Sequence, residues 1–155
     1  MSSAHPVAVA ARATKLAAAT ALGIDQDFIS QLVEQFYAKV HIDPVLAPVF
    51  AAKVTDWPAH LARMKQFWAA ILLGEGHFNG SPMAVHSAIP GIGSFHFRRW
   101  LVLFDATLHE LESNPAATEL VSARAHAIAD SLLTGIHIHR DDRRDFQALK
   151  GFNHA

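Results

Sequence analysis

The chain contains no cysteine among its 155 residues. Disulfides, thiolate metal sites and a cysteine nucleophile are therefore excluded, and any bound metal must be held by imidazole, carboxylate or hydroxyl groups. Charge is also scarce, since Asp, Glu, Lys and Arg make up 17% of the chain and the formal net charge is −1. Nucleic acids and anionic membranes are bound through clustered Lys and Arg, so we expect neither as a partner.

Long apolar runs are missing as well. No stretch approaches the roughly 20 apolar residues that a transmembrane helix needs. The chain is nevertheless 51% apolar. This length and composition predict one globular domain with one sizeable core.

Residues 1–24 form an Ala-rich extension that contains Arg12 and Lys15 and no acidic residue. A targeting peptide shares this composition, although the two cations interrupt the apolar stretch that a secretory signal keeps whole. The other interpretation is an extra helix from about Pro6 to Leu22, ended by Gly23, because Ala is the best helix former and Gly a common stop. We favour the helix and, without a secretory signal or disulfides, expect a cytoplasmic protein.

The chain from Asp25 to about Ile138 is predicted to be a domain made of helices only. Apolar residues recur there at three- and four-residue spacing, as on the buried face of a helix, and no strand pattern occurs. Pro44 and Pro48 are expected to break the chain into turns. Asp56 can then cap a helix. The inner face of that helix carries His60, Met64, Phe67 and Trp68.

Glycine and proline separate the remaining predicted helices. A loop comes first, and it contains Gly74, Gly76 and Gly80. A short helix from Pro82 to Ala88 follows and carries His86. A long helix from about Ser94 to Ser113 precedes a last helix that ends near Ile138. Residues 139–155 are polar and charged, so we expect a surface tail.

Two histidines, His60 and His86, are set among six aromatic residues: Phe36, Tyr37, Phe50, Phe67, Trp68 and Trp100. One imidazole able to bind a metal, a second able to face it and this much flat apolar surface indicate a buried haem. A histidine on an apolar helix is more often a satisfied core residue than a ligand. The glycine-rich loop before His86 favours ligation there. For His60, ligand contact, a gate to solvent and iron binding all stay open.

Several ordered motifs resemble those of the truncated haemoglobins, and within them the third group. They are FYAKV at residues 36–40, DPVLAPVF at 43–50, DWPAHLARMKQFW at 56–68, GSPMAVH at 80–86 and RRWLVLF at 98–104. The resemblance covers about Asp25 to Ile138, and the absence of any Gly-Gly pair also favours the third group. It implies a truncated globin fold whose helices sandwich a haem, here with an extra N-terminal helix.

The resemblance also implies roles for single positions. His86 matches the proximal histidine that binds the iron of haem b, which is iron protoporphyrin IX. Tyr37, His60 and Trp100 match the distal residues that face a ligand of the iron. Phe36, Phe50, Phe67 and Trp68 match the aromatic residues that hold the helices and the haem together. Met64, on the same helix face as His60, is expected in the haem pocket as well, and Arg63 could pair with a haem propionate. Arg63 has a second interpretation as a solvated surface arginine.

An iron held by one neutral imidazole keeps a position free for O2, NO or another diatomic ligand. Hydrogen bonds from Tyr37 and Trp100 would slow release of that ligand. Slow release suits NO dioxygenation or peroxide turnover, with an unidentified electron donor as partner, better than oxygen delivery. Whether the protein is an enzyme stays open. The alternative is a haem-free helical module for regulation or interaction on a globin scaffold.

One position departs from the family pattern. The proximal histidine is commonly followed by leucine, whereas His86 is followed by Ser87. A hydroxyl at this place could change which group accepts the imidazole N–H, and such a partner tunes the electronic properties of the iron.

Overall fold

The computed structural model describes residues 6–75 and 80–152, with only the backbone course for residues 139 and 141–152. Residues 1–5 of the predicted extension, Gly76 of the predicted loop and residues 153–155 lie outside this range. The described chain contains seven helices and no strand, which confirms the all-α prediction. In order, they are α1 (Pro6–Ala21), α2 (Gln26–Ile42), α3 (Ala47–Lys53), α4 (Trp57–Leu73), α5 (Pro82–Ser87), α6 (Ser94–Glu110) and α7 (Pro115–Phe152).

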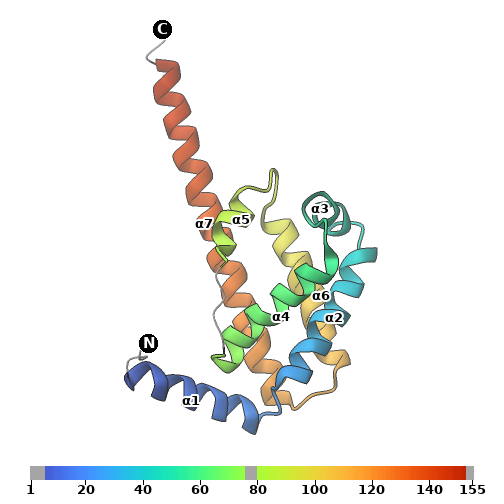
Figure 1. Ribbon diagram of the computed structural model, residues 1–155. Coiled ribbons are helices and arrows are strands. Elements are labelled where there is room, and N and C mark those ends of the chain that lie inside the picture. Colours follow the sequence, from blue (N-terminus) through green and yellow to red (C-terminus); the bar gives the residue numbers. More distant parts are fainter. Residues whose placement is uncertain (1–5, 76–79, 153–155) are drawn as a thin grey trace.

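The body of the molecule is a bundle around α2, α4, α6 and α7 (Figure 1). Helix α2 packs against α4 and α6, α6 packs against α7, and the short α5 also packs against α7. Their apolar faces meet in a core whose fully buried side chains include Leu32, Val33, Phe104, Leu108 and Val121. Figure 1 shows α1 across one end of the bundle, while the C-terminal part of α7 extends beyond the other end.

Helix α1 is the extra N-terminal helix that the alanine content predicts. It packs against α4 and buries Ala19 there. Gly23 has a positive φ of 78°, which a glycine adopts without strain, and ends the helix as expected. Within the described residues, no single helix is long and apolar enough to cross a bilayer, and α1 with α2 reaches that length only across a 71° bend.

Local side-chain contacts start the two helices that carry the distal side of the site. The Asp25 carboxylate accepts a hydrogen bond from the backbone N–H of Phe28 at 2.8 Å, at the start of α2. The Asp56 carboxylate accepts one from the N–H of Ala59 at 3.1 Å, at the start of α4. Each satisfies a donor that the first turn of a helix leaves unpaired, so the predicted cap at Asp56 is confirmed.

Two boundaries differ from the sequence predictions. The segment around Pro44 and Pro48 is not only turns, because Pro48 lies in the first turn of α3, where a missing N–H costs nothing. The last helix does not end near Ile138 but continues to Phe152. Residues 139–150 contain neither Pro nor Gly and include several good helix formers, so polarity alone does not end the helix.

Asp43 ties the corner between α2 and α3 to α6. Its carboxylate accepts hydrogen bonds from the N–H groups of Val45 and Leu46 at 3.1 and 3.0 Å. It also accepts from Arg99 through Nε at 2.7 Å and Nη2 at 2.6 Å. The Asp43 side chain is only 2% exposed. Hydrogen bonding to Arg99 is the main reason why the pKa of Asp43 lies below its ordinary value, and the two N–H groups add to it.

Replacing Asp43 is expected to destabilise the fold. We predict that Asp43→Ala lowers the free energy of unfolding by about 2 kcal/mol, because two hydrogen bonds to the backbone and the charged pair with Arg99 are lost together. Asp43→Asn should cost less, since the amide oxygen can still accept from the backbone. Urea denaturation of both variants measures the difference, and Asp130→Ala, which removes an exposed carboxylate from the middle of α7, is the control.

The same comparison has a pH dependence. The folded pKa of Asp43 is depressed, so its stabilising contribution is complete above about pH 4, the unfolded value, and is lost as the pH falls through the folded value. The stability gap between wild type and Asp43→Asn should therefore shrink in acid. A gap that is constant from pH 7 down to pH 2 would contradict the ion pair.

Candidate functional site

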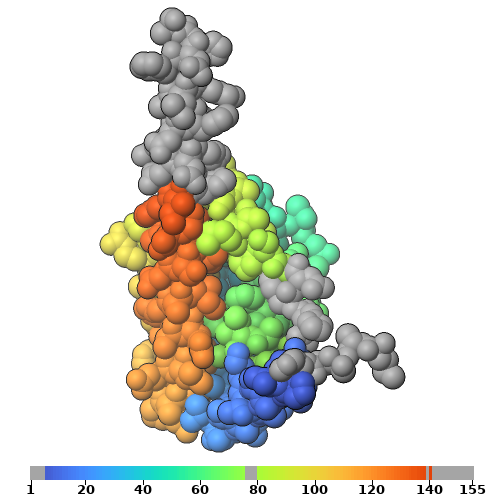
Figure 2. Space-filling view, turned by 90° about the vertical axis from the view of Figure 1, so that its left-hand side faces the viewer, coloured from blue at the N-terminus to red at the C-terminus, as the bar shows by residue number. Residues whose placement is uncertain are grey.

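A cavity of about 340 Å³ lies among the helices of the bundle. Side chains from α2, α3, α4, α5, α6 and α7 line it, and most of them are apolar. Figure 2 shows the hollow between α5 and α4, beside α7. All ten residues predicted for the site line this one cavity: Phe36, Tyr37, Phe50, His60, Arg63, Met64, Phe67, Trp68, His86 and Trp100. The folded chain thus brings together residues that are far apart in the sequence.

His86 is oriented by the backbone of its own helix. Ser81 caps α5, and Pro82 occupies its first turn. The Nδ1 atom of His86 lies 2.6 Å from the carbonyl oxygen of Pro82. A carbonyl can only accept, so Nδ1 carries the proton and donates it. The Nε2 atom then keeps its lone pair, which is the form of imidazole that binds a metal.

The carbonyl of Pro82, and not the hydroxyl of Ser87, is the partner of the His86 N–H. The hydroxyl of Ser87 therefore does not change the acceptor of the imidazole N–H, contrary to the possibility that the sequence raised. The reason is geometric: a residue one position further along a helix points to a different side, whereas the carbonyl four positions back lies below the imidazole.

The end of the Met83 side chain on α5 lies directly against Gly135 on α7. A side chain at Gly135 would overlap the sulfur and terminal methyl of Met83. Met83 also packs against the small core cluster that includes Phe97, Leu132 and Ile136. Within the part of α7 whose side chains the structure describes, α5 therefore rests on α7 through apolar contacts.

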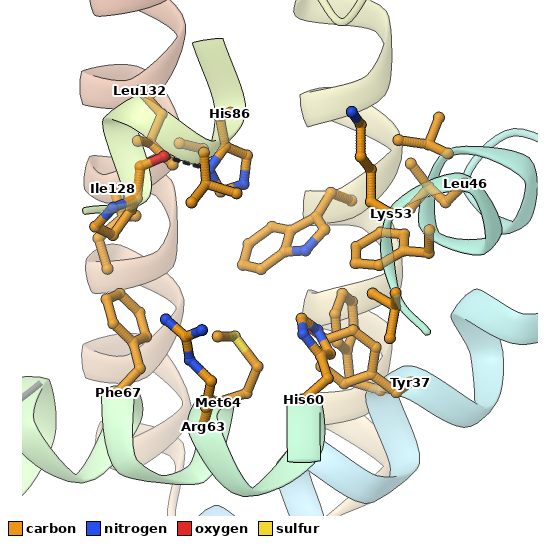
Figure 3. Close-up of a pocket in the computed structure, with 18 of the residues that line it drawn as sticks. Tyr37, Leu46, Lys53, His60, Arg63, Met64, Phe67, His86, Ile128 and Leu132 are labelled. Carbon is orange, nitrogen blue, oxygen red and sulfur yellow. Dashed lines mark hydrogen bonds between the residues drawn. The ribbon is translucent and has the colours of Figure 1, made fainter. Parts of the chain in front are cut away.

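His60 faces the cavity from α4. Its Nε2 is buried and has no hydrogen-bond partner among the described residues. Figure 3 shows His86 across the cavity from His60, Met64 and Phe67. Desolvation is the main cause that lowers the pKa of His60, and the nearby charge of Arg63 lowers it further. The imidazole is thus neutral at pH 7, with one polar nitrogen available to a group in the cavity.

Tyr37 lies next to His60, with ring centroids 5.1 Å apart and planes at 88°. The tyrosine is 6% exposed, and burial raises its pKa above the ordinary value. The phenol therefore stays protonated and can donate. Trp100 lines the cavity from α6 and stacks on Phe104 at 5.0 Å. Its indole N–H is a second donor type on the same cavity.

Aromatic side chains form the wall behind these donors. Phe36 meets Trp100 edge-on at 5.2 Å, and Trp68 stacks on Phe104 at 5.2 Å. Phe67 contacts Trp68 at 5.5 Å. Offset and edge-to-face pairs of this kind are favourable beyond the area they bury. They make the wall apolar and tightly packed.

Cationic and polar residues that the sequence interpretation missed also line the cavity. Exposed Lys53, at the end of α3, joins exposed Arg63 there. His96 lines it from the start of α6, where its Nδ1 accepts a hydrogen bond from the N–H of Gly93 at 3.2 Å. The sequence could have indicated that Lys53 lines the site, because it lies three residues after Phe50 on the same short helix. No sequence pattern indicates the position of His96.

The family model of the bacterial-like globins matches residues 19–133, which is most of the chain. The chain belongs to the bacterial-like globin family. This globin is 36% identical over 110 residues to the group 3 truncated hemoglobin ctb of Campylobacter jejuni, covering 68% of this chain and 86% of the relative.

Solved structures agree with the sequence relationship. The crystal structure of the group III truncated hemoglobin from Campylobacter jejuni matches with a TM-score of 0.69 at 35% identity, over 73% of this chain and 91% of that one. The group II truncated hemoglobin from Bacillus anthracis matches with a TM-score of 0.63 at 24% identity, over 74% and 88%, and shows the fold alone. The resemblance to group III truncated haemoglobins and the truncated globin fold are confirmed.

Membership in the globin family implies a haem cofactor, and the cavity of this globin fits one. Nε2 of His86 has the tautomer that binds iron. The buried, unpaired Nε2 of His60 lies on the opposite side. The apolar aromatic side chains suit a porphyrin, and Lys53 and Arg63 suit its carboxylates. The residues present thus have the chemistry that haem requires.

The unpaired nitrogen of His60 predicts an unusual effect on stability. We expect His60→Leu to raise the free energy of unfolding of the haem-free protein by about 1 kcal/mol, because it removes a buried polar atom without a partner. The gain should grow as the pH falls below about 6.5, since the unfolded chain then binds a proton that folded His60 resists. Thermal unfolding between pH 5 and 8 measures both effects.

Exposed His109 provides the control for this prediction. His109→Leu should leave the stability of the haem-free protein nearly unchanged across the same pH range. A loss of stability in His60→Leu at every pH would show that its Nε2 is satisfied.

Proposed function

We propose that this globin binds haem b through His86 and holds O2, NO or another diatomic ligand on the opposite side of the iron. The observation that carries the proposal is the pair of opposed imidazoles. One has a fixed tautomer with a free Nε2, and the other presents a buried nitrogen without a partner. Iron held by one imidazole supplies a free position where a diatomic molecule can bind.

The chain's own residues determine how long such a ligand stays. Tyr37 remains protonated because burial raises its pKa, so its O–H is always available as a donor. Trp100 offers an N–H from α6, and His60 offers a polar nitrogen from α4. Donors in a dry cavity stabilise partial negative charge more strongly than in water. The distal residues are thus suited to retain a polarised ligand.

Other pocket residues would hold the porphyrin itself. Arg63 and Lys53 are the cations that can pair with its carboxylates. Phe36, Phe50, Met64, Phe67 and Trp68 supply apolar contact. The globin in the crystal from Campylobacter jejuni is named a truncated hemoglobin, which supports the proposal.

A redox activity is the second candidate function. NO dioxygenation or peroxide turnover benefits from slow ligand release, which the distal donors favour, and each needs an electron donor that is not identified. The neutral carbonyl behind His86 makes its imidazole less basic than a carboxylate partner would. This feature favours ligand binding over cleavage of an O–O bond. A cytoplasmic location stays a prediction.

An absorption spectrum tests haem binding directly. Protein produced with an adequate haem supply should show a Soret band. His86→Gly should lose this band, and added imidazole should restore it by filling the space of the missing side chain. His109→Gly, at an exposed position, is the control and should keep the band. A wild-type protein without a Soret band would favour the haem-free regulatory or interaction module.

Ligand release tests the distal donors. We expect Tyr37→Phe to accelerate O2 dissociation about tenfold, because one hydrogen bond of about 1.4 kcal/mol is lost. Trp100→Phe should act in the same direction. Phe67→Leu removes an aromatic ring but no donor, so it should change the rate little. Stopped-flow mixing measures the O2 dissociation rates. Rapid O2 release that Tyr37→Phe leaves unchanged would contradict a hydrogen bond from Tyr37 to the ligand.

A further inference from the structure

Trp57 contacts the half-buried distal histidine, an exposed histidine, and the rings of Tyr37 and Phe50 at centroid distances of 5.8 and 6.2 Å. It is the first residue of α4, directly after its cap, and is half-buried. Its ring centroid lies 5.6 Å from that of His60 and 4.0 Å from that of exposed His41. Trp57 does not itself line the cavity. It therefore acts on the site only through the residues that it touches.

His60 is enclosed by three aromatic rings. Tyr37, Phe50 and Trp57 meet its imidazole edge-on, with centroids 5.1, 6.1 and 5.6 Å away. Trp57 precedes His60 by three positions on α4, so the two share one helix face. Helical side chains lean towards the N-terminus, which brings His60 over the turn that starts at Trp57. The indole thus occupies the space beside the histidine at the beginning of the helix.

The polarity of the His60 side chain alone would favour a position turned towards water, not the inward position that it has. Its Nε2 is buried without a partner among the described residues. Turning towards water would give that nitrogen a hydrogen bond, and buried polar atoms normally have one. Contacts with the surrounding rings must oppose this turn. Tyr37 and Phe50 belong to the cavity wall, which leaves Trp57 as the contact outside it.

We propose that Trp57 is a positioning residue that holds His60 inside the pocket and thereby slows ligand entry. The inference deepens the proposed function, since it concerns access to the same haem site. It assigns a role to a residue that neither lines the cavity nor reaches the iron. His41 lies against the indole and restricts it from the exposed end of α2.

Carbon monoxide association to the ferrous holoprotein is the kinetic test. We expect Trp57→Ala to raise the association rate about three- to tenfold, as the loss of aromatic contacts predicts. In a His60→Leu background the same substitution should have no further effect, because there is no imidazole to release. Non-additivity of this kind distinguishes a role through His60 from a general loosening of the fold.

Two variants control the kinetic test. Trp57→Phe keeps a flat ring in contact with His60 and should stay close to the wild-type rate. Ile71→Ala removes a side chain of α4 that packs against the core and does not line the cavity. It should lower stability but leave the association rate unchanged. If Trp57→Ala does not fold, Trp57→Leu takes its place, since it also lacks the ring.

Chemical labelling gives a second readout that does not depend on ligand binding. Diethyl pyrocarbonate modifies accessible imidazoles, and peptide mass spectrometry compares His60 with exposed His109 in the same sample. Trp57→Ala should accelerate labelling of His60 relative to His109, whereas Trp57→Phe and Ile71→Ala should not. Unchanged labelling, or equal rate effects of Trp57→Ala with and without His60, would overturn the proposal. A missing Soret band in wild type would instead refute haem binding.

Discussion

Edge-to-face contacts of Phe36 join the helices on which the pocket depends. From α2, this ring meets Tyr37, Trp100 and Phe104 at centroid distances of 5.0, 5.2 and 5.6 Å. Trp68 of α4 then stacks on Phe104. Three helices are thus held at one aromatic cluster, which is both the core of the bundle and the back wall of the cavity. Any movement of α2 or α6 would shift the distal donors and the wall together.

Polar atoms inside this apolar frame are arranged unequally. The buried Asp43 carboxylate is well hydrogen-bonded, since it accepts from two backbone N–H groups and from Arg99. The buried Nε2 of His60 has no hydrogen-bond partner among the described residues. A satisfied buried group fixes the frame, whereas an unsatisfied one costs stability unless something else pairs with it. This contrast separates the structural part of the molecule from the part prepared for a ligand.

The sequence predicted those features that depend on local chemistry or on ordered motifs. Asp56 caps α4, and the ten predicted site residues converge on one cavity. The predictions of helix ends were wrong where one residue type allows two outcomes. Pro48 lies in the first turn of α3 instead of breaking the chain, and the polar stretch after Ile138 continues α7. His96 was missed for another reason: its place on the cavity wall depends on how α6 crosses the other helices, and the spacing of residues along the chain does not determine that angle. The contact of Trp57 with His60 follows from their three-residue spacing, whereas its contact with His41 depends on how α2 lies against α4.

The seat of α5 on α7 leaves the two sides of the cavity mechanically different. The Asp43–Arg99 ion pair and stacked rings tie the distal helices to one another, whereas α5 rests on α7 through Met83 and neighbouring apolar side chains. A thioether has three rotatable bonds and only weak, non-directional contacts. Such a seat yields to small displacements without breaking a hydrogen bond. We therefore expect the proximal side to adjust more readily than the opposite wall to a group bound in the cavity.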